Sequence, residues 1–120
     1  GNDTLIGGAG QDIFRFDSTL GTNVTPNIDQ IIDFVAADDT IHLENSIFTS
    51  FGTTTTGTIN AGFFTANTTG VAADSNDYLV YETDTGKLFY DADGSGAGAS
   101  VQIALLGTSL PLTNADFALI

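Results

Sequence analysis

The residues best suited to chemistry are aspartates and glycines at the start of the chain. Residues 7–15 read Gly-Gly-Ala-Gly-Gln-Asp-Ile-Phe-Arg and fit the nonapeptide G-G-x-G-x-D-x-U-x, in which U is a large apolar residue. Residues 1–6 fit the last six positions of the same nonapeptide, nine residues earlier. Asp3 therefore corresponds to Asp12, and two copies in register argue against a chance match.

This combination of residue types favours a bound calcium ion. Calcium is a hard cation that takes about 6–8 oxygen ligands from carboxylates and backbone carbonyls. Glycines let the backbone turn with positive φ and bring its carbonyl groups close to an ion. The x-U-x triplet is long enough for a short strand with one large inward side chain, and repeats of this kind must stack to bury a core. The sequence predicts a calcium loop, and the alternative is a glycine-rich hairpin turn without an ion.

A second acidic segment, residues 91–96, reads Asp-Ala-Asp-Gly-Ser-Gly. It matches the first six positions of an EF-hand loop, with oxygens at positions 1, 3 and 5 and glycine at position 6. Position 12 is Gln102, which cannot supply a bidentate carboxylate, and the flanking residues are predicted strands, so an EF-hand is excluded. Two interpretations remain: a weak calcium turn at Asp91 and Asp93, or an Asp-Gly turn that joins two strands.

The composition narrows the possible partners. The chain has 120 residues, with 15 acidic side chains against 2 basic ones and a formal net charge of −13. This charge excludes nucleic acid and anionic membranes as direct partners and calls for a counter-cation. Cysteine is absent and there is one histidine, so disulfides, thiol nucleophiles and multi-histidine metal sites are excluded. The longest strongly apolar run, residues 103–106, is too short for membrane insertion.

The elements that must position these residues are mainly strands. Apolar runs at residues 78–81 and 87–90 flank Asp-Thr-Gly at 84–86, which predicts a hairpin with glycine in the turn. Residues 100–105 alternate apolar and polar, so Val101, Ile103 and Leu105 are expected to face a core.

Helix signals are scarce. Thr-Asn-Ala-Asp at residues 113–116 has the spacing of a capping box and predicts a single helical turn. Residues 60–64 are consistent with either a short helical turn or a loop. With 42% apolar residues, the chain suits one mostly β domain.

The repeat resembles the end of an RTX (repeats-in-toxin, hemolysin-type calcium-binding) β-roll, as found in serralysin-type metalloproteases and other type I-secreted bacterial proteins. The following segments are similar to motifs that come after the last repeat in that family. They are D-x-I-x-D-F at residues 29–34, D-x-I-x-L at 39–43, Y-D-A-D-G at 90–94 and L-T-x-A-D-F at 112–117.

The resemblance implies a fold and a ligand set. Residues 1–16 would be the last nonapeptides of a parallel β-roll, and residues 17–120 a β-sandwich-like C-terminal cap with few short helical turns. In the family, each ion lies between loops i and i+2. One ion is therefore expected on Asp12 and Asp29, with the carbonyls of Gly8 and Gly10. Two further aspartates are candidate ligands, half of a site at Asp3 and a closing residue at Asp17.

The resemblance also implies a function. The chain would be a non-catalytic, calcium-dependent module of an extracellular protein, joined to an upstream domain of the same polypeptide and exported by a type I secretion apparatus that recognises residues 116–120. The start of the chain has no initiator Met and no basic or apolar leader, which indicates a piece of a longer protein. The alternatives are a structural or adhesion module that uses the Thr/Asn-rich loops, and the tail of a secreted hydrolase.

Overall fold

The computed structural model describes residues 2–21, 27–96 and 100–120; Gly1 of the truncated repeat lies outside them. Their strands form two sheets. Sheet A has the order β1 (Thr4–Leu5), β3 (Asp29–Ile31), β9 (Val101–Leu105), β8 (Lys87–Tyr90), β7 (Leu79–Glu82) and β6 (Phe64–Asn67). Sheet B has the order β2 (Ile13–Phe16), β4 (Thr40–Leu43), β10 (Phe117–Leu119) and β5 (Gly57–Thr58).

The helical content of the described residues consists of three short 3₁₀ turns, η1 (Thr49–Phe51), η2 (Ala61–Phe63) and η3 (Asn114–Asp116). The prediction of a mostly β fold with few short helical turns is therefore confirmed. None of the helical segments in these ranges has the length and apolar character needed to cross a membrane.

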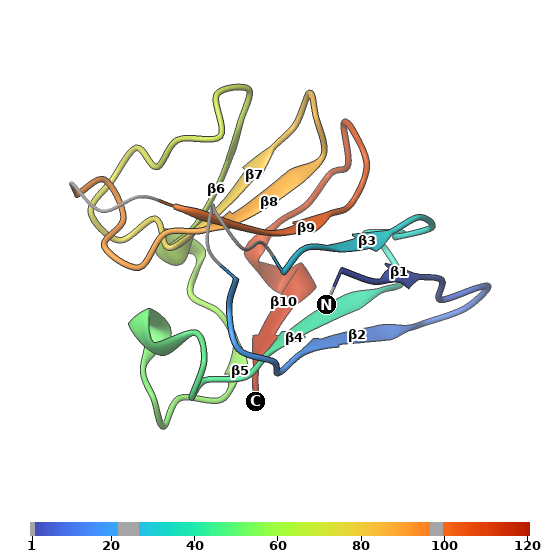
Figure 1. The fold of residues 1–120 in the computed structure, drawn as a ribbon, viewed down its shortest axis with the longest axis horizontal. Coiled ribbons are helices and arrows are strands. Elements are labelled where there is room, and N and C mark those ends of the chain that lie inside the picture. The colour runs from blue at the N-terminus through green and yellow to red at the C-terminus, as the bar shows by residue number, and fades with distance from the viewer. Residues whose placement is uncertain (1, 22–26, 97–99) are drawn as a thin grey trace.

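The repeat strands alternate between the two sheets. The chain passes from β1 in sheet A, through the glycine loop, to β2 in sheet B (Figure 1). The next two strands repeat this path, since β3 pairs in parallel with β1 and β4 pairs in parallel with β2. Phe14 is buried beside Ile41, so the large residue of the repeat points into the core as the nonapeptide predicts. β1 and β2 are the outer strands of their sheets.

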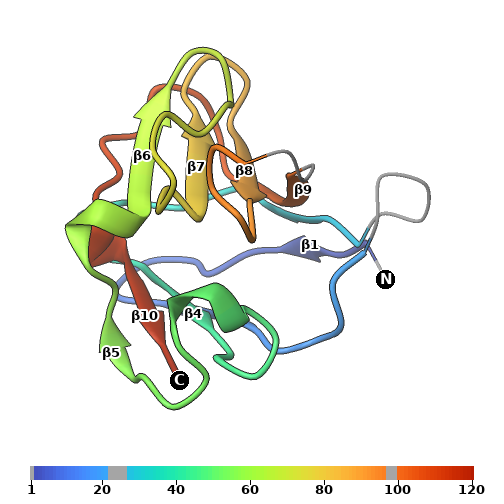
Figure 2. The same ribbon diagram turned by 90° about the vertical axis from the view of Figure 1, so that its left-hand side faces the viewer.

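The rest of sheet A forms the wall opposite sheet B. β6, β7 and β8 run side by side in one layer, with β4, β5 and β10 in the other (Figure 2). The predicted hairpin is confirmed as β7 and β8, and its Gly86 has a φ of 82°. A Cβ at Gly86 would lie 2.7 Å from the backbone of Gly107, so the turn needs glycine for space as well as for φ. Tyr81 is fully buried and its hydroxyl donates to the carbonyl of Gly107.

Strand β9 corrects one prediction. The pairing of β8 with β9 slips between Leu88 and Phe89, where a bulge places Leu88 opposite Ala104 and Phe89 opposite Gln102. Ile103 and Ala104 are consequently both buried. Val101 and Leu105 are half-buried, so strict alternation of inward residues was wrong outside Ile103.

The last strand lies inside sheet B. β10 pairs in parallel with β4 and antiparallel with β5, and its Phe117 is fully buried. The 3₁₀ turn η3 leads into it and is closed by the predicted capping box. The Thr113 hydroxyl accepts from the Ala115 N–H at 3.2 Å, and the Asp116 carboxylate accepts from the Thr113 N–H at 2.8 Å.

Removing the capping hydroxyl should destabilise the domain. Thr113→Ala leaves the Ala115 N–H without its acceptor, and we expect the free energy of unfolding to fall by about 1 kcal/mol. Urea denaturation at fixed calcium measures the change. Thr113→Ser keeps the hydroxyl and serves as the control; equal losses in both variants would contradict the capping role.

The partner residue of the capping box should make stability depend on pH. Burial raises the pKa of Asp116 above its usual value, against the opposing effect of the Thr113 N–H. The folded state therefore binds this proton more tightly than the unfolded state, and the stability it provides at acid pH is lost as pH rises above 3.8.

Asp116→Asn removes this titration while keeping an acceptor for the Thr113 N–H. We expect the stability of wild type relative to the variant to decrease from pH 4 upward, as measured by urea denaturation over that range. A difference that stays flat, or grows with pH, would contradict the raised pKa.

Candidate metal centres

The glycine loop between β1 and β2 carries an unpaired carboxylate oxygen. Gly8 and Gly10 have φ values of 90° and 95°, the conformations that the nonapeptide requires. The carboxylate of Asp12 folds against Gly7, where a Cβ would lie 2.7 Å from Asp12 Cγ. Asp12 Oδ2 is buried and has no hydrogen-bond partner. An unpaired buried carboxylate oxygen beside glycine backbone is suited to a cation, and the residues present thus fit a calcium ion.

Two aspartates from the segment between β3 and β4 hold this loop. Asp33 accepts from the N–H groups of Gly7 at 2.9 Å and Gly8 at 2.7 Å. These two hydrogen bonds lower the pKa of Asp33, so its carboxylate is anionic at neutral pH. Asp39 is 3% exposed and accepts from the N–H groups of Asp12 at 3.0 Å and Val35 at 2.8 Å.

Sequence reasoning missed the roles of Asp33 and Asp39. Both belong to motifs singled out after the repeat, the D-x-I-x-D-F and D-x-I-x-L segments, so the signal was present. Their function as acceptors depends on the register of β1 against β3 and of β2 against β4, which links residues 25–27 positions apart.

The structure brings Asp29 together with Asp3. The carboxylate of Asp29 accepts from the Asp3 N–H at 2.9 Å, because Thr4 lies opposite Gln30 in the parallel pair β1 and β3. The backbone of Asp12 bonds instead to Asp39. The hydrogen bonds thus place Asp29 at the start of β3 beside Asp3, and they do not join it to Asp12.

Asp17 shares a small cavity with Asp3 and Asp29. The cavity has a volume of about 60 Å³, and Phe48 and Ile103 contribute to its lining. Among the described residues, no three Asp, Glu or His side chains gather into a group that could hold a metal. Any ion bound there would therefore need carbonyl or water oxygens as further ligands.

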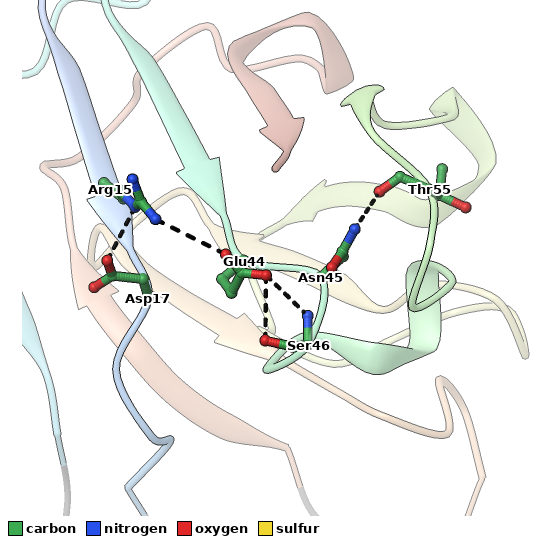
Figure 3. Close-up of polar contacts among 6 residues, drawn as sticks. All are labelled: Arg15, Asp17, Glu44, Asn45, Ser46 and Thr55. Atoms are coloured by element: carbon green, nitrogen blue, oxygen red, sulfur yellow. Dashed lines mark hydrogen bonds and ion pairs between the residues drawn. The ribbon is translucent and has the colours of Figure 1, made fainter.

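A basic side chain already compensates Asp17. Arg15 Nε lies 2.9 Å from Asp17 Oδ2, and Arg15 Nη2 lies 3.9 Å from Glu44 Oε2 (Figure 3). Glu44 in turn accepts from the hydroxyl of Ser46, which fixes the start of the following turn. The negative charge of Asp17 is therefore partly neutralised by Arg15, whereas Asp12 Oδ2 has no hydrogen-bond partner.

The second acidic segment also contains an unpaired oxygen. Asp91 follows β8 and is 7% exposed, and its Oδ1 has no hydrogen-bond partner. Burial raises the pKa of Asp91 to about 6, and the neighbouring carboxylate of Asp93 adds to the effect. Asp93 itself is exposed. Asp12 and Asp91 thus each present a buried oxygen at one of the two positions that the sequence indicated.

Loss of Asp39 should be costly because two backbone groups depend on it. Asp39→Ala leaves the N–H groups of Asp12 and Val35 without an acceptor, and we expect the free energy of unfolding to fall by about 3 kcal/mol. Chemical denaturation in saturating calcium measures the loss. The exposed neighbour Asp38→Ala is the control and should change stability by less than about 0.5 kcal/mol. Similar effects for both would contradict the role of Asp39 as the acceptor on which these two backbone groups depend.

The comparisons with known proteins agree with the resemblance seen in the repeat. Residues 1–119 match the family described as peptidase M10 serralysin C terminal. Neither the curated proteins nor the solved structures contain a match to the chain. The family match spans nearly the whole chain, including both sheets and both acidic loops. The chain therefore belongs to the peptidase M10 serralysin C-terminal family.

Proposed function

We propose that this domain is the calcium-binding C-terminal module of a larger secreted protein, that it folds on calcium outside the cell and that it carries a type I secretion signal. The family match supports the placement in serralysin-type proteins, which are secreted. The observation that carries the calcium assignment is the buried, unpaired Oδ2 of Asp12. We assign the peptidase activity of serralysin-type proteins to a part of the polypeptide outside this chain.

The proposed ligands are Asp12 and the carbonyl groups of Gly8 and Gly10. Both glycines have positive φ, which allows the loop to present carbonyls without side-chain clashes. Asp29 was expected to share this ion, and its hydrogen bond to Asp3 supports a separate role in fixing β1 on β3. Asp3 and Asp17 line the same cavity as Asp29 and remain candidate ligands for an ion there.

The net charge supports the coupling of folding to calcium. With a formal charge of −13, the carboxylates repel one another when calcium is scarce, and the chain is biased toward open states. A weak site has a Kd of about 10⁻⁴–10⁻³ M, far above cytosolic calcium. Calcium in modest excess over Kd adds about 1–3 kcal/mol per site, enough to shift a marginally stable domain.

The position of the proposed signal supports recognition before folding. Residues 116–120 include β10, which lies between β4 and β5, with Phe117 and Leu119 buried. In the folded domain this segment is therefore covered on both edges. A secretion apparatus would read it from the unfolded chain, which is the state that low calcium favours.

The two outer strands support an upstream partner in the same polypeptide. β1 and β2 follow one another in the chain, and among the strands of the described residues each has a free edge in its sheet. Successive strands from β1 to β4 lie alternately in sheet A and sheet B. One further strand can pair with each edge if it continues this alternation. Strands of preceding repeats would cover both edges.

A thermal melt tests the proposal. We expect the melting temperature in millimolar calcium to exceed that in EGTA, to saturate with calcium and not to rise equally in magnesium. Asp12→Ala should weaken calcium affinity, because it removes the unpaired carboxylate oxygen. The control Asp84→Asn changes an exposed turn residue by the same loss of charge and should leave affinity unchanged.

Asp29→Ala completes the design. If Asp29 fixes β1 on β3, this variant should lose stability equally with and without calcium. A loss of affinity equal to that of Asp12→Ala would instead establish one shared ion. Unchanged affinity in Asp12→Ala would remove Asp12 from the site.

A further inference from the structure

Strand β6 is an open edge on the side of the molecule away from the repeat. Among the strands of the described residues it is the last of sheet A, and its partner in the sheet is β7. It lies at the margin of the fold opposite the N-terminus, on the same side as β5 (Figure 2). An unpaired strand edge is a template for one further strand.

The backbone of β6 directs alternate residues toward this open edge. The Asn67 carbonyl accepts from the Thr83 N–H at 2.8 Å, so Asn67 turns its backbone groups to β7. The direction of these groups alternates along a strand, and those of Phe64 and Ala66 therefore point away from β7. Ala66 is also exposed. Two residues of β6 thus each offer one donor and one acceptor to a further strand.

β6 lacks the features that usually protect an edge strand. Its residues, Phe64–Asn67, include no charged residue and no proline. On the same side of the molecule, sheet B ends in β5, which has 2 residues and is a short edge. The edges of β1 and β2 are those that preceding repeats would cover. β6 is therefore an edge that is long enough to pair and has no residue that prevents pairing.

The surface around β6 is uncharged in an otherwise acidic chain. Residues 45–73, which include η1, β5, η2 and β6, contain no Asp, Glu, Lys, Arg or His, although the chain has a net charge of −13. The charged residue of β7 in register with β6 is Glu82, opposite Asn67, and its carboxylate accepts from the Thr85 hydroxyl at 2.5 Å. Two copies of the chain repel each other through their acidic surfaces, and contact through this uncharged side brings few of those charges together.

We propose that β6 is a self-association edge, to which β6 of a second copy of this chain adds in antiparallel orientation. With a two-fold axis at Thr65, Phe64 lies opposite the partner's Ala66, and the two residues exchange both of their backbone hydrogen bonds. The two copies of Thr65 then form a pair without hydrogen bonds, with Cα atoms about 4.5 Å apart. The same residues serve on both sides, as a closed two-fold dimer requires.

A second copy fits this edge better than a charged partner or a sugar. Residues 45–73 offer no counter-charge to an acidic or a basic partner. Their phenylalanines are buried or half-buried, so they present no exposed aromatic face on which a sugar could stack. One added pair of short strands makes a small interface, and we therefore expect a weak dimer that forms at high protein concentration. The inference does not rest on the calcium ligands or on the secretion signal.

Sedimentation velocity of the whole chain in millimolar calcium, over a series of protein concentrations, measures this association. In wild type we expect a dimer whose Kd falls as salt is added, because salt screens the repulsion between two acidic chains. Ala66→Lys places two like charges close to each other across the axis and should raise Kd by about tenfold or more. Ala37→Lys, in the exposed turn between β3 and β4, changes the charge equally and should leave Kd unchanged.

A single cysteine tests the register of the pair. The chain contains no cysteine, so Thr65→Cys introduces one thiol. The Cα separation of about 4.5 Å lies within the range of a disulfide, about 4.4–6.8 Å. The control is Thr54→Cys, in the exposed loop before β5. Under mild oxidation we expect Thr65→Cys to form a cross-linked dimer at least about tenfold faster than the control, although residue 65 is less exposed, because pairing raises the effective concentration of the two thiols.

Three results would overturn the proposal. The first is a wild type that stays monomeric at high protein concentration in high salt. The second is a dimer that Ala66→Lys and Ala37→Lys weaken equally, and the third is cross-linking at equal rates in the two cysteine variants. Circular dichroism checks that each variant is folded; if Ala66→Lys is not, the cross-linking rates decide.

Discussion

The fold depends on side-chain carboxylates that accept hydrogen bonds from backbone N–H groups. The strands are two to five residues long, so much of the backbone lies in loops where the ladders of the sheets cannot pair it. Aspartates supply the missing acceptors at the junctions between elements. They are Asp29, Asp33, Asp39, Asp77 and Asp116. Each of them fixes backbone that lies outside the hydrogen-bond ladders of the sheets.

This use of aspartate contributes to the acidity of the domain. Every carboxylate that closes a loop adds a negative charge, and two basic residues cannot compensate 15 acidic ones. Most of the acceptors are satisfied by N–H groups, but Asp12 and Asp91 each keep one buried oxygen unpaired. The unpaired oxygens of the described residues thus lie in two loops, one between the repeat strands and one at the end of β8.

The features that could be predicted from the sequence are those determined by neighbouring residues. The nonapeptide places Phe14 inward, Gly86 turns the hairpin, and Thr113 with Asp116 closes a capping box. The features that could not be predicted depend on the register of distant strands. The bulge that buries Ala104 and the bonds of Asp33 to the glycine loop follow from pairings that no local pattern encodes.

The placement of β10 has a consequence for the order in which the domain can be assembled. β4 is available early in the chain, yet its partner on one side comes from residues 117–119, more than 70 positions later. Sheet B therefore stays split, with β4 and β5 apart, until residue 119 has left the ribosome. Until then, the edges of β4 and β5 that β10 covers stay unpaired. The pairing of β10 joins these two strands, so it is a late step in the formation of sheet B.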